Sequence, residues 1–90
     1  MNCGNELKSG QVVKALAGRD KNNMFVVVDI IDDDYVSIAD GAKRKIEAPK
    51  RKKIKHLQKY NLISESINRK FVKGEKLDNS EIRKELSLYR

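Results

Sequence analysis

The chain has 90 residues, 37% of them charged, and its 20 Lys and Arg outweigh 13 Asp and Glu to give a net charge of +7. A chain of this size forms one small domain with a small core. No apolar run approaches the roughly 18 to 20 residues of a membrane span, and the N-terminus lacks the apolar centre of a signal peptide, so we expect a cytoplasmic protein with no membrane partner.

Short β-branched runs separated by turn-forming residues fill the first part of the chain. The runs are GQVVKAL (10–16), MFVVVDII (24–31), YVSIA (35–39), KRKIEA (43–48) and KKIKHL (52–57), and the breaks are AGRDKNN, DDD, DGA and APK. Breaks this short predict an antiparallel meander. Five short strands are too few for a sandwich, so we expect them to curl into a small, partly closed barrel that hides its edges.

The hydrophobic period changes from 2 to about 3.6 near residues 59–61, which predicts a barrel over 1–60 and a helical extension over 61–90 packed on it. The first helix should begin at an Asn61 N-cap, end at Gly74, and present one apolar face. That face comprises Leu62, Ile63, Ile67, Phe71 and Val72. In the second helix, Asp78 and Glu81 resemble a capping box, and Ile82, Leu86 and Tyr89 form the apolar stripe.

Positive charge is concentrated in one segment, GAKRKIEAPKRKKIKHLQK (41–59). It contains nine of the 20 Lys and Arg and a single acid, Glu47, so it carries +8, whereas the remaining 11 bases and 12 acids sum to −1. Charge of one sign repels itself, so such a segment is either a solvated tail or a surface that faces a polyanion.

Apolar residues at regular intervals indicate that this segment is folded. Ile46, Ile54 and Leu57 lie among the charges, and the alternation of KKIKHL places Ile54 inward with Lys53 and Lys55 outward. Pro49 then links two strands. The alternative is a disordered basic tail, but such tails usually lack this spacing.

The sequence offers no recognisable catalytic or metal-binding motif. It lacks phosphate-loop, dinucleotide-binding, metalloprotease and nucleophile-elbow patterns, and Cys3 and His56 show no zinc-ligand spacing. The acidic run Asp32–Asp34 fits a solvated hairpin turn better than a metal site. We therefore expect a protein that is not an enzyme and needs no metal or cofactor.

The stretch GQVVKALAGRDKNNMFVVVDIIDDDYVSIADG (10–41) resembles a KOW motif, which is a strand, a Gly-containing loop and a second strand found in small SH3-like barrels. With its continuation through KRKI and KRKKIKHLQ, the segment from about Ser9 to Gln58 is similar to the KOW-domain ribosomal proteins numbered fourteen in the e-type series of archaeal and eukaryotic large subunits, and to short bacterial relatives. The resemblance implies a mostly β fold, with an SH3-like barrel followed by two short helices.

One position departs from the KOW pattern. The usual loop runs glycine, two variable residues, lysine, glycine, whereas here it runs Gly18, Arg19, Asp20, Lys21, Asn22. If the last position requires a positive φ, Asn is the least costly replacement for glycine. We interpret Asn22 as a tolerated substitution.

The resemblance implies RNA binding by the loop and the basic strand, with ribosomal RNA and the ribosome as partners. The basic segment independently favours a nucleic acid, whose phosphates supply most of the affinity. Phe25 and Tyr35 are the aromatics of the strand region and neither is next to the charge cluster in sequence. We therefore expect binding to structured RNA rather than stacking of single strands. We also expect a monomer.

The candidate RNA-binding residues are Arg19, Lys21, Lys43, Arg44, Lys45, Lys50, Arg51, Lys52, Lys53, Lys55 and His56, with Gly18, Asn22 and Gly41 setting loop geometry. His56 fits packing or phosphate contact better than catalysis, because no partner base or nucleophile is in view. Tyr60 fits either stacking on RNA or packing between barrel and helix. The alternative function is a protein-interaction module whose basic barrel docks an acidic protein partner.

Overall fold

The protein is mostly β, with a five-stranded sheet followed by two helices. The computed structural model describes residues 7–88, so Cys3 and Tyr89 lie outside the described residues, as does the side chain of Leu62. The strands are β1 (Gln11–Ala15), β2 (Met24–Ile30), β3 (Tyr35–Ala39), β4 (Lys50–Lys53) and β5 (Leu57–Ile63), and the helices are α1 (Glu65–Lys73) and α2 (Asn79–Ser87). A short 3-10 helix, η1 (Ile54–His56), joins β4 to β5.

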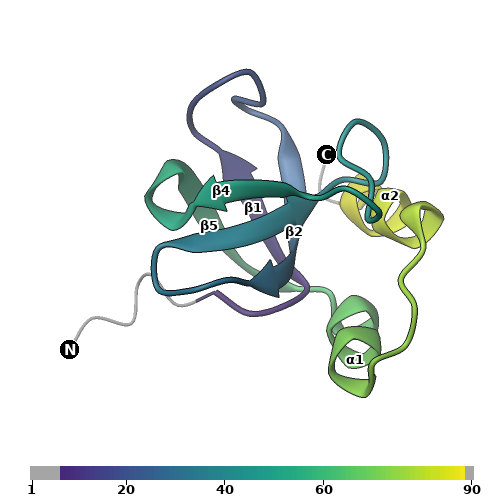
Figure 1. The fold of residues 1–90 in the computed structure, drawn as a ribbon. Coiled ribbons are helices and arrows are strands. Elements are labelled where there is room, and N and C mark those ends of the chain that lie inside the picture. The colour runs from purple at the N-terminus through teal and green to yellow at the C-terminus, as the bar shows by residue number, and fades with distance from the viewer. Residues whose placement is uncertain (1–6, 89–90) are drawn as a thin grey trace.

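The strands form one antiparallel half-barrel sheet in the order β4-β3-β2-β1-β5 (Figure 1). The first four strands follow one another as neighbours, which confirms the predicted meander. β5 closes back on β1, so the first strand lies inside the sheet.

Both faces of the central strands are buried over much of their length, which explains the apolar runs Val12–Val13 in β1 and Phe25–Val28 in β2. Val13, Phe25 and Val27 belong to the cluster on the concave side of the sheet, which also contains Ala15, Val36, Ile38 and Leu57. Val12 and Val26 alternate with them and face the helices, in a cluster with Val28, Ala39, Ile67, Leu77, Ile82 and Leu86. The two helices therefore complete the core, because they cover one face of the sheet.

Two predicted strands are wrong in position. KRKIEA (43–48) is a loop of bends and turns, and KKIKHL (52–57) is divided among the end of β4, η1 and the first residue of β5. The alternation in KKIKHL is interrupted because Ile54 begins a 3-10 turn. Ile54 is nevertheless directed inward, where it packs on the concave cluster.

The first helix begins three residues later than predicted, because residues 57–63 form β5. Ser64, not Asn61, is the N-cap, and its hydroxyl accepts a hydrogen bond from the Ile67 amide. The predicted apolar face is also mostly wrong: Ile67 is buried, but Phe71 and Val72 are 38% and 74% exposed. The predicted stop is confirmed, since Gly74 adopts the left-handed conformation with φ 73°.

The second helix follows the prediction more closely. Asp78 is the N-cap, with its carboxylate accepting from the Ser80 amide at 3.0 Å, and Ile82 and Leu86 are fully buried. Glu81 does not complete the capping box, because its carboxylate pairs with Lys70 of α1 instead. Neither helix in the described range is long and apolar enough to cross a membrane.

Candidate nucleic-acid interface

The loop between β1 and β2 has the backbone that the sequence predicts. Gly18 has φ 82° and Asn22 has φ 73°, and Asn22 is the one non-glycine residue with a positive φ among residues 7–88. The Asn22 amide donates to Ala15 O at 2.8 Å, which closes the loop on the end of β1. This geometry leaves Arg19 and Lys21 exposed.

An ion pair with a buried carboxylate connects this loop to the basic segment. Asp20 is 4% exposed, and its Oδ2 accepts from Arg44 Nη2 at 3.0 Å and from Arg44 Nε at 3.3 Å. Nothing in the sequence pattern pairs these two residues, which lie 24 positions apart. Arg44 is therefore a link between the two loops as well as a cation of the surface.

Lys52 makes a second connection to the same loop. Its ammonium donates to Ala17 O at 3.3 Å, and a Cβ on Gly18 would lie 3.2 Å from that nitrogen. Lys52 pairs across the sheet with Val36, and its strand neighbour Lys50 with Ile38, so both point to the concave face at the rim of the half-barrel. The cations of β4 thus lie on both faces of the strand.

The loop from Gly41 to Pro49 is closed by Asp40, which is 7% exposed. Its Oδ1 accepts from the amides of Ala42 and Arg44, both at 2.9 Å, and its own amide donates to Arg44 O at 2.9 Å. These bonds satisfy a buried carboxylate within the loop. Lys43 is exposed at the outside of this turn.

Helix α2 holds the other side of the loop. The Asn79 side chain accepts from the Ile46 amide at 2.8 Å and donates to Glu47 Oε1 at 2.8 Å, and Arg83 donates to Gly41 O. Gly41 has φ 79°, and a Cβ there would collide with Asn79 O. Gly41 is thus required by the packing of the loop on α2. The sequence predicts only its role in turn geometry.

The hydrogen bond from Asn79 lowers the pKa of Glu47, and a bond to the residue's own backbone and the nearby charges of Lys45 and Lys76 act in the same direction. Glu47 is therefore ionised at neutral pH, which offsets part of the charge of Lys45.

Tyr35 lies directly beside the basic strand, contrary to the expectation from its position in the sequence. It pairs across the sheet with Lys53. Arg51 Cζ lies 4.8 Å from the centre of its ring and Lys53 Nζ 5.9 Å from it, which are cation–π distances. Phe25, by contrast, is fully buried in the concave cluster.

The remaining candidates lie on the loop Gly41–Pro49, on β4 and on η1. Lys50 and Lys55 are exposed, and Lys45 is exposed near Glu47. His56 is half-buried in η1 and contributes its backbone O, which accepts from the Leu16 amide at 2.8 Å.

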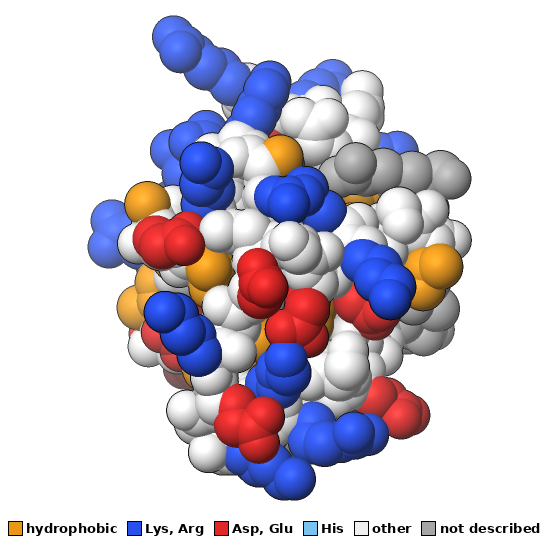
Figure 2. All heavy atoms as spheres, turned by 90° about the vertical axis from the view of Figure 1, so that its right-hand side faces the viewer, with side chains coloured by type: hydrophobic (Ala, Val, Ile, Leu, Met, Phe, Trp, Pro, Cys, Tyr) orange, Lys and Arg blue, Asp and Glu red, His pale blue; other side chains and the backbone are white. Residues whose placement is uncertain are grey.

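The helical side of the molecule carries mixed charge. Figure 2 shows Asp and Glu interspersed with Lys and Arg over most of it, whereas Lys and Arg predominate toward the top, the end where Figure 1 places the β1–β2 loop. Tyr60 is half-buried and packs against the helix-facing cluster, which favours the packing role over the stacking one.

The acidic run is a hairpin turn, as predicted. Asp32 Oδ1 accepts from the amides of Asp34 and Tyr35, both at 2.8 Å, and the three aspartates are exposed. Within residues 7–88 there is no group of three His, Cys, Asp or Glu side chains placed to hold a metal ion.

Compared with models of known protein families, the chain matches none, and no curated protein matches it either. The geometry itself defines a surface of three segments: the β1–β2 loop, the loop Gly41–Pro49 and β4. We refer to these three segments together as the basic rim.

Proposed function

We propose that this protein is a non-catalytic RNA-binding protein, associated with the ribosome or ribosomal RNA, and that the basic rim binds the backbone of structured RNA. The charge distribution supports this assignment, because the segment 41–59 carries +8 and the rest of the chain carries −1. A concentrated positive surface on a folded domain attracts a polyanion, and release of condensed counterions supplies the affinity.

The observation that carries the proposal is the joining of two cation groups that are distant in sequence. The Asp20–Arg44 pair and the bond from Lys52 to Ala17 hold the β1–β2 loop against the basic segment. Arg19 and Lys21 thereby join Lys43, Lys50 and their neighbours on one surface. A rigid array of this kind is suited to phosphates at fixed spacing along a folded RNA.

The resemblance to KOW-domain ribosomal proteins supports the RNA assignment and the SH3-like character of the barrel. The antiparallel half-barrel has the strand, loop and second strand that a KOW motif requires, and Asn22 takes the left-handed conformation that its glycine would supply. The ribosomal partner rests on this resemblance alone.

A salt titration on a fully paired RNA hairpin tests the proposal. If about five to seven cations contact phosphates, log K should fall against log salt with a slope of about −4 to −6. Changing Lys50, Arg51 and Lys53 to Glu should reduce both affinity and slope, and sparing Lys52 keeps its bond to the loop. The fold should persist, since exposed charges contribute little to stability.

The matched control reverses three exposed cations away from the rim, Lys8, Lys73 and Lys84. This control changes the net charge by the same amount but leaves the basic rim intact, so it should weaken RNA binding far less. An equal loss in both variants would mean that only net charge matters, and a slope near zero for the wild type would favour the alternative, a module that docks an acidic protein.

The ribosomal association has its own measurement. We expect the protein to sediment with ribosomal particles when a cell lysate is fractionated on a sucrose gradient at low salt, and to leave them at high salt. Sedimentation only at the top of the gradient at low salt would leave RNA binding in place and contradict the ribosomal assignment.

A further inference from the structure

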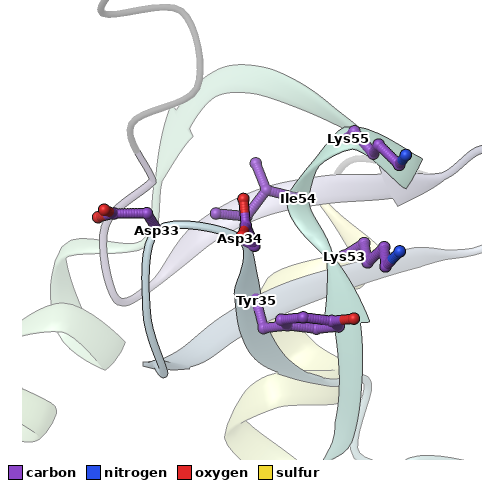
Figure 3. A pocket seen from close by; sticks show the side chains of 6 residues that line it. All are labelled: Asp33, Asp34, Tyr35, Lys53, Ile54 and Lys55. Carbon is purple, nitrogen blue, oxygen red and sulfur yellow. The ribbon is translucent and has the colours of Figure 1, made fainter.

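A hollow of about 280 Å³ lies where the β2–β3 turn meets the end of β4, at one end of the basic rim. It is lined by Asp33, Asp34, Tyr35, Lys53, Ile54 and Lys55 (Figure 3). The sequence gives no sign of it, because its two walls are 18 or more residues apart and come together only through strand pairing.

The walls of this hollow are fixed by backbone hydrogen bonds. The Ile54 amide donates to Asp34 O at 2.8 Å, which joins η1 to the hairpin turn. Asp32 holds the turn itself through the amides of Asp34 and Tyr35. Tyr35 is positioned by its pairing with Lys53. A site held in this way needs little reordering when a ligand enters it.

The chemistry of the lining differs from one side to the other. Tyr35 contributes an aromatic face and Ile54 an apolar side chain, and Figure 3 shows the Lys53 and Lys55 ammonium groups directed to the same side as the Tyr35 hydroxyl. The carboxylates of Asp33 and Asp34 lie on the other side. Arg51, which also contacts the Tyr35 ring, does not line the hollow.

We propose that this hollow binds a single unpaired nucleotide of an otherwise structured RNA, an inference that rests on the proposed function. The base stacks on Tyr35 beside Ile54, and Lys53 and Lys55 contact the flanking phosphates. Asp34 accepts a hydrogen bond from an exocyclic amino group, which cytosine carries and uracil lacks. Paired segments would then bind the rest of the rim through their backbone, and the unpaired nucleotide would set the register.

The test compares two RNA hairpins that differ only by one bulged cytidine. At equal salt, wild-type protein should bind the bulged hairpin about 5- to 100-fold more tightly, the range expected for one base stacked on an aromatic ring. A bulged uridine should gain less, and an abasic bulge should bind like the paired hairpin. Tyr35→Phe should keep the preference, because the ring remains.

Tyr35→Leu should abolish the preference for the bulge and leave the salt-dependent affinity for the paired hairpin intact. Asp34→Asn should reduce the discrimination between bulged cytidine and uridine. Because Tyr35→Leu could disturb the strand pair, a readout on wild-type protein accompanies it: the Tyr35 ring resonances in NMR should shift clearly more with the bulged hairpin than with the paired one, since only the bulged base stacks on the ring.

Failure of this inference is distinguishable from failure of the proposed function. Equal, salt-dependent affinity for the two hairpins would overturn the nucleotide site and leave backbone binding standing. Unchanged Tyr35 resonances with the bulged RNA would do the same. Absence of binding to both hairpins at low salt would overturn both proposals.

Discussion

The loop Gly41–Pro49 and strand β4 are adjacent in sequence and each contains several cations, yet the fold uses their charges differently. In the loop, Asp20 and Asp40 bind Arg44, and Asn79 holds the backbone beyond it. In β4, Arg51 and Lys53 lie on an aromatic ring at the surface. The difference shows that a run of cations can contain both structural links and cations that stay at the surface, and that only tertiary partners separate the two.

The largest loss of stability should come from disrupting the contact between the loop Gly41–Pro49 and α2. Gly41→Ala places a methyl group against Asn79 O in a left-handed conformation, so we expect a loss of about 2 to 4 kcal/mol in the free energy of unfolding. Gly74 is the control: its φ of 73° is similar and a Cβ there meets nothing within 4 Å, so Gly74→Ala should cost about 1 kcal/mol. Equal losses in urea denaturation would show that the contact with α2 is unimportant.

The structural role of Arg44 can be separated from its charge. Arg44→Met leaves the Asp20 carboxylate buried without its partner, and we expect a loss of about 1 to 3 kcal/mol. Lys43→Met removes the same charge from an exposed neighbour and should change stability by less than about 0.5 kcal/mol. If the two variants unfold at the same urea concentration, Arg44 is no more structural than Lys43.

The β1–β2 loop, which Arg44 and Lys52 both contact, depends on the backbone conformation of one residue. Asn22 has φ 73°, so Asn22→Val should destabilise the protein by about 1 to 2 kcal/mol, whereas Asn22→Gly should be nearly neutral. The urea midpoints of the two variants measure the difference. A Val variant as stable as the Gly variant would mean that the loop relaxes to another conformation at no cost.

The smallest effect concerns Glu47, whose pKa the Asn79 hydrogen bond lowers below its ordinary value of 4.5. A depressed pKa means that the carboxylate contributes stability above pH 4.5, and that this contribution is lost as the pH falls through the folded-state value. The free energy of unfolding of wild type should therefore slightly exceed that of Glu47→Gln at pH 7, and the difference should disappear once the pH lies below the folded-state pKa of Glu47. A difference that persists in acid would assign the effect to hydrogen bonding of the neutral group.

The sequence predicts the strands that their own apolar residues define. It misses the segments whose structure depends on contacts with distant parts of the chain. The apolar runs of β1, β2 and β3 identify them because each strand buries one or both faces. KRKIEA (43–48) has a strand-like composition, but hydrogen bonds to Asp40 and Asn79 fold it into a loop. β5 is not predicted because Asn61 resembles a helix N-cap. In the structure the strand continues past Asn61 and pairs with β1.

The candidate site shows the same division. The left-handed Asn22 follows from the spacing of the loop residues, since it occupies a position where glycine is usual. The contact of Tyr35 with Arg51 does not follow from the sequence, because it depends on the register between β3 and β4. The Asp20–Arg44 pair likewise requires the fold, since many acids could have paired with that arginine.

The place of β4 at the edge of the sheet has a consequence for how the protein behaves in concentrated solution. An edge strand presents unpaired amides and carbonyls that can add a strand from another molecule, and lysines on the edge oppose this by repulsion. All four residues of β4 are Lys or Arg. Neutralising them, by substitution or by an excess of polyanion, removes that repulsion, so precipitation of such variants would report exposed strand edges joining between intact molecules rather than loss of the fold.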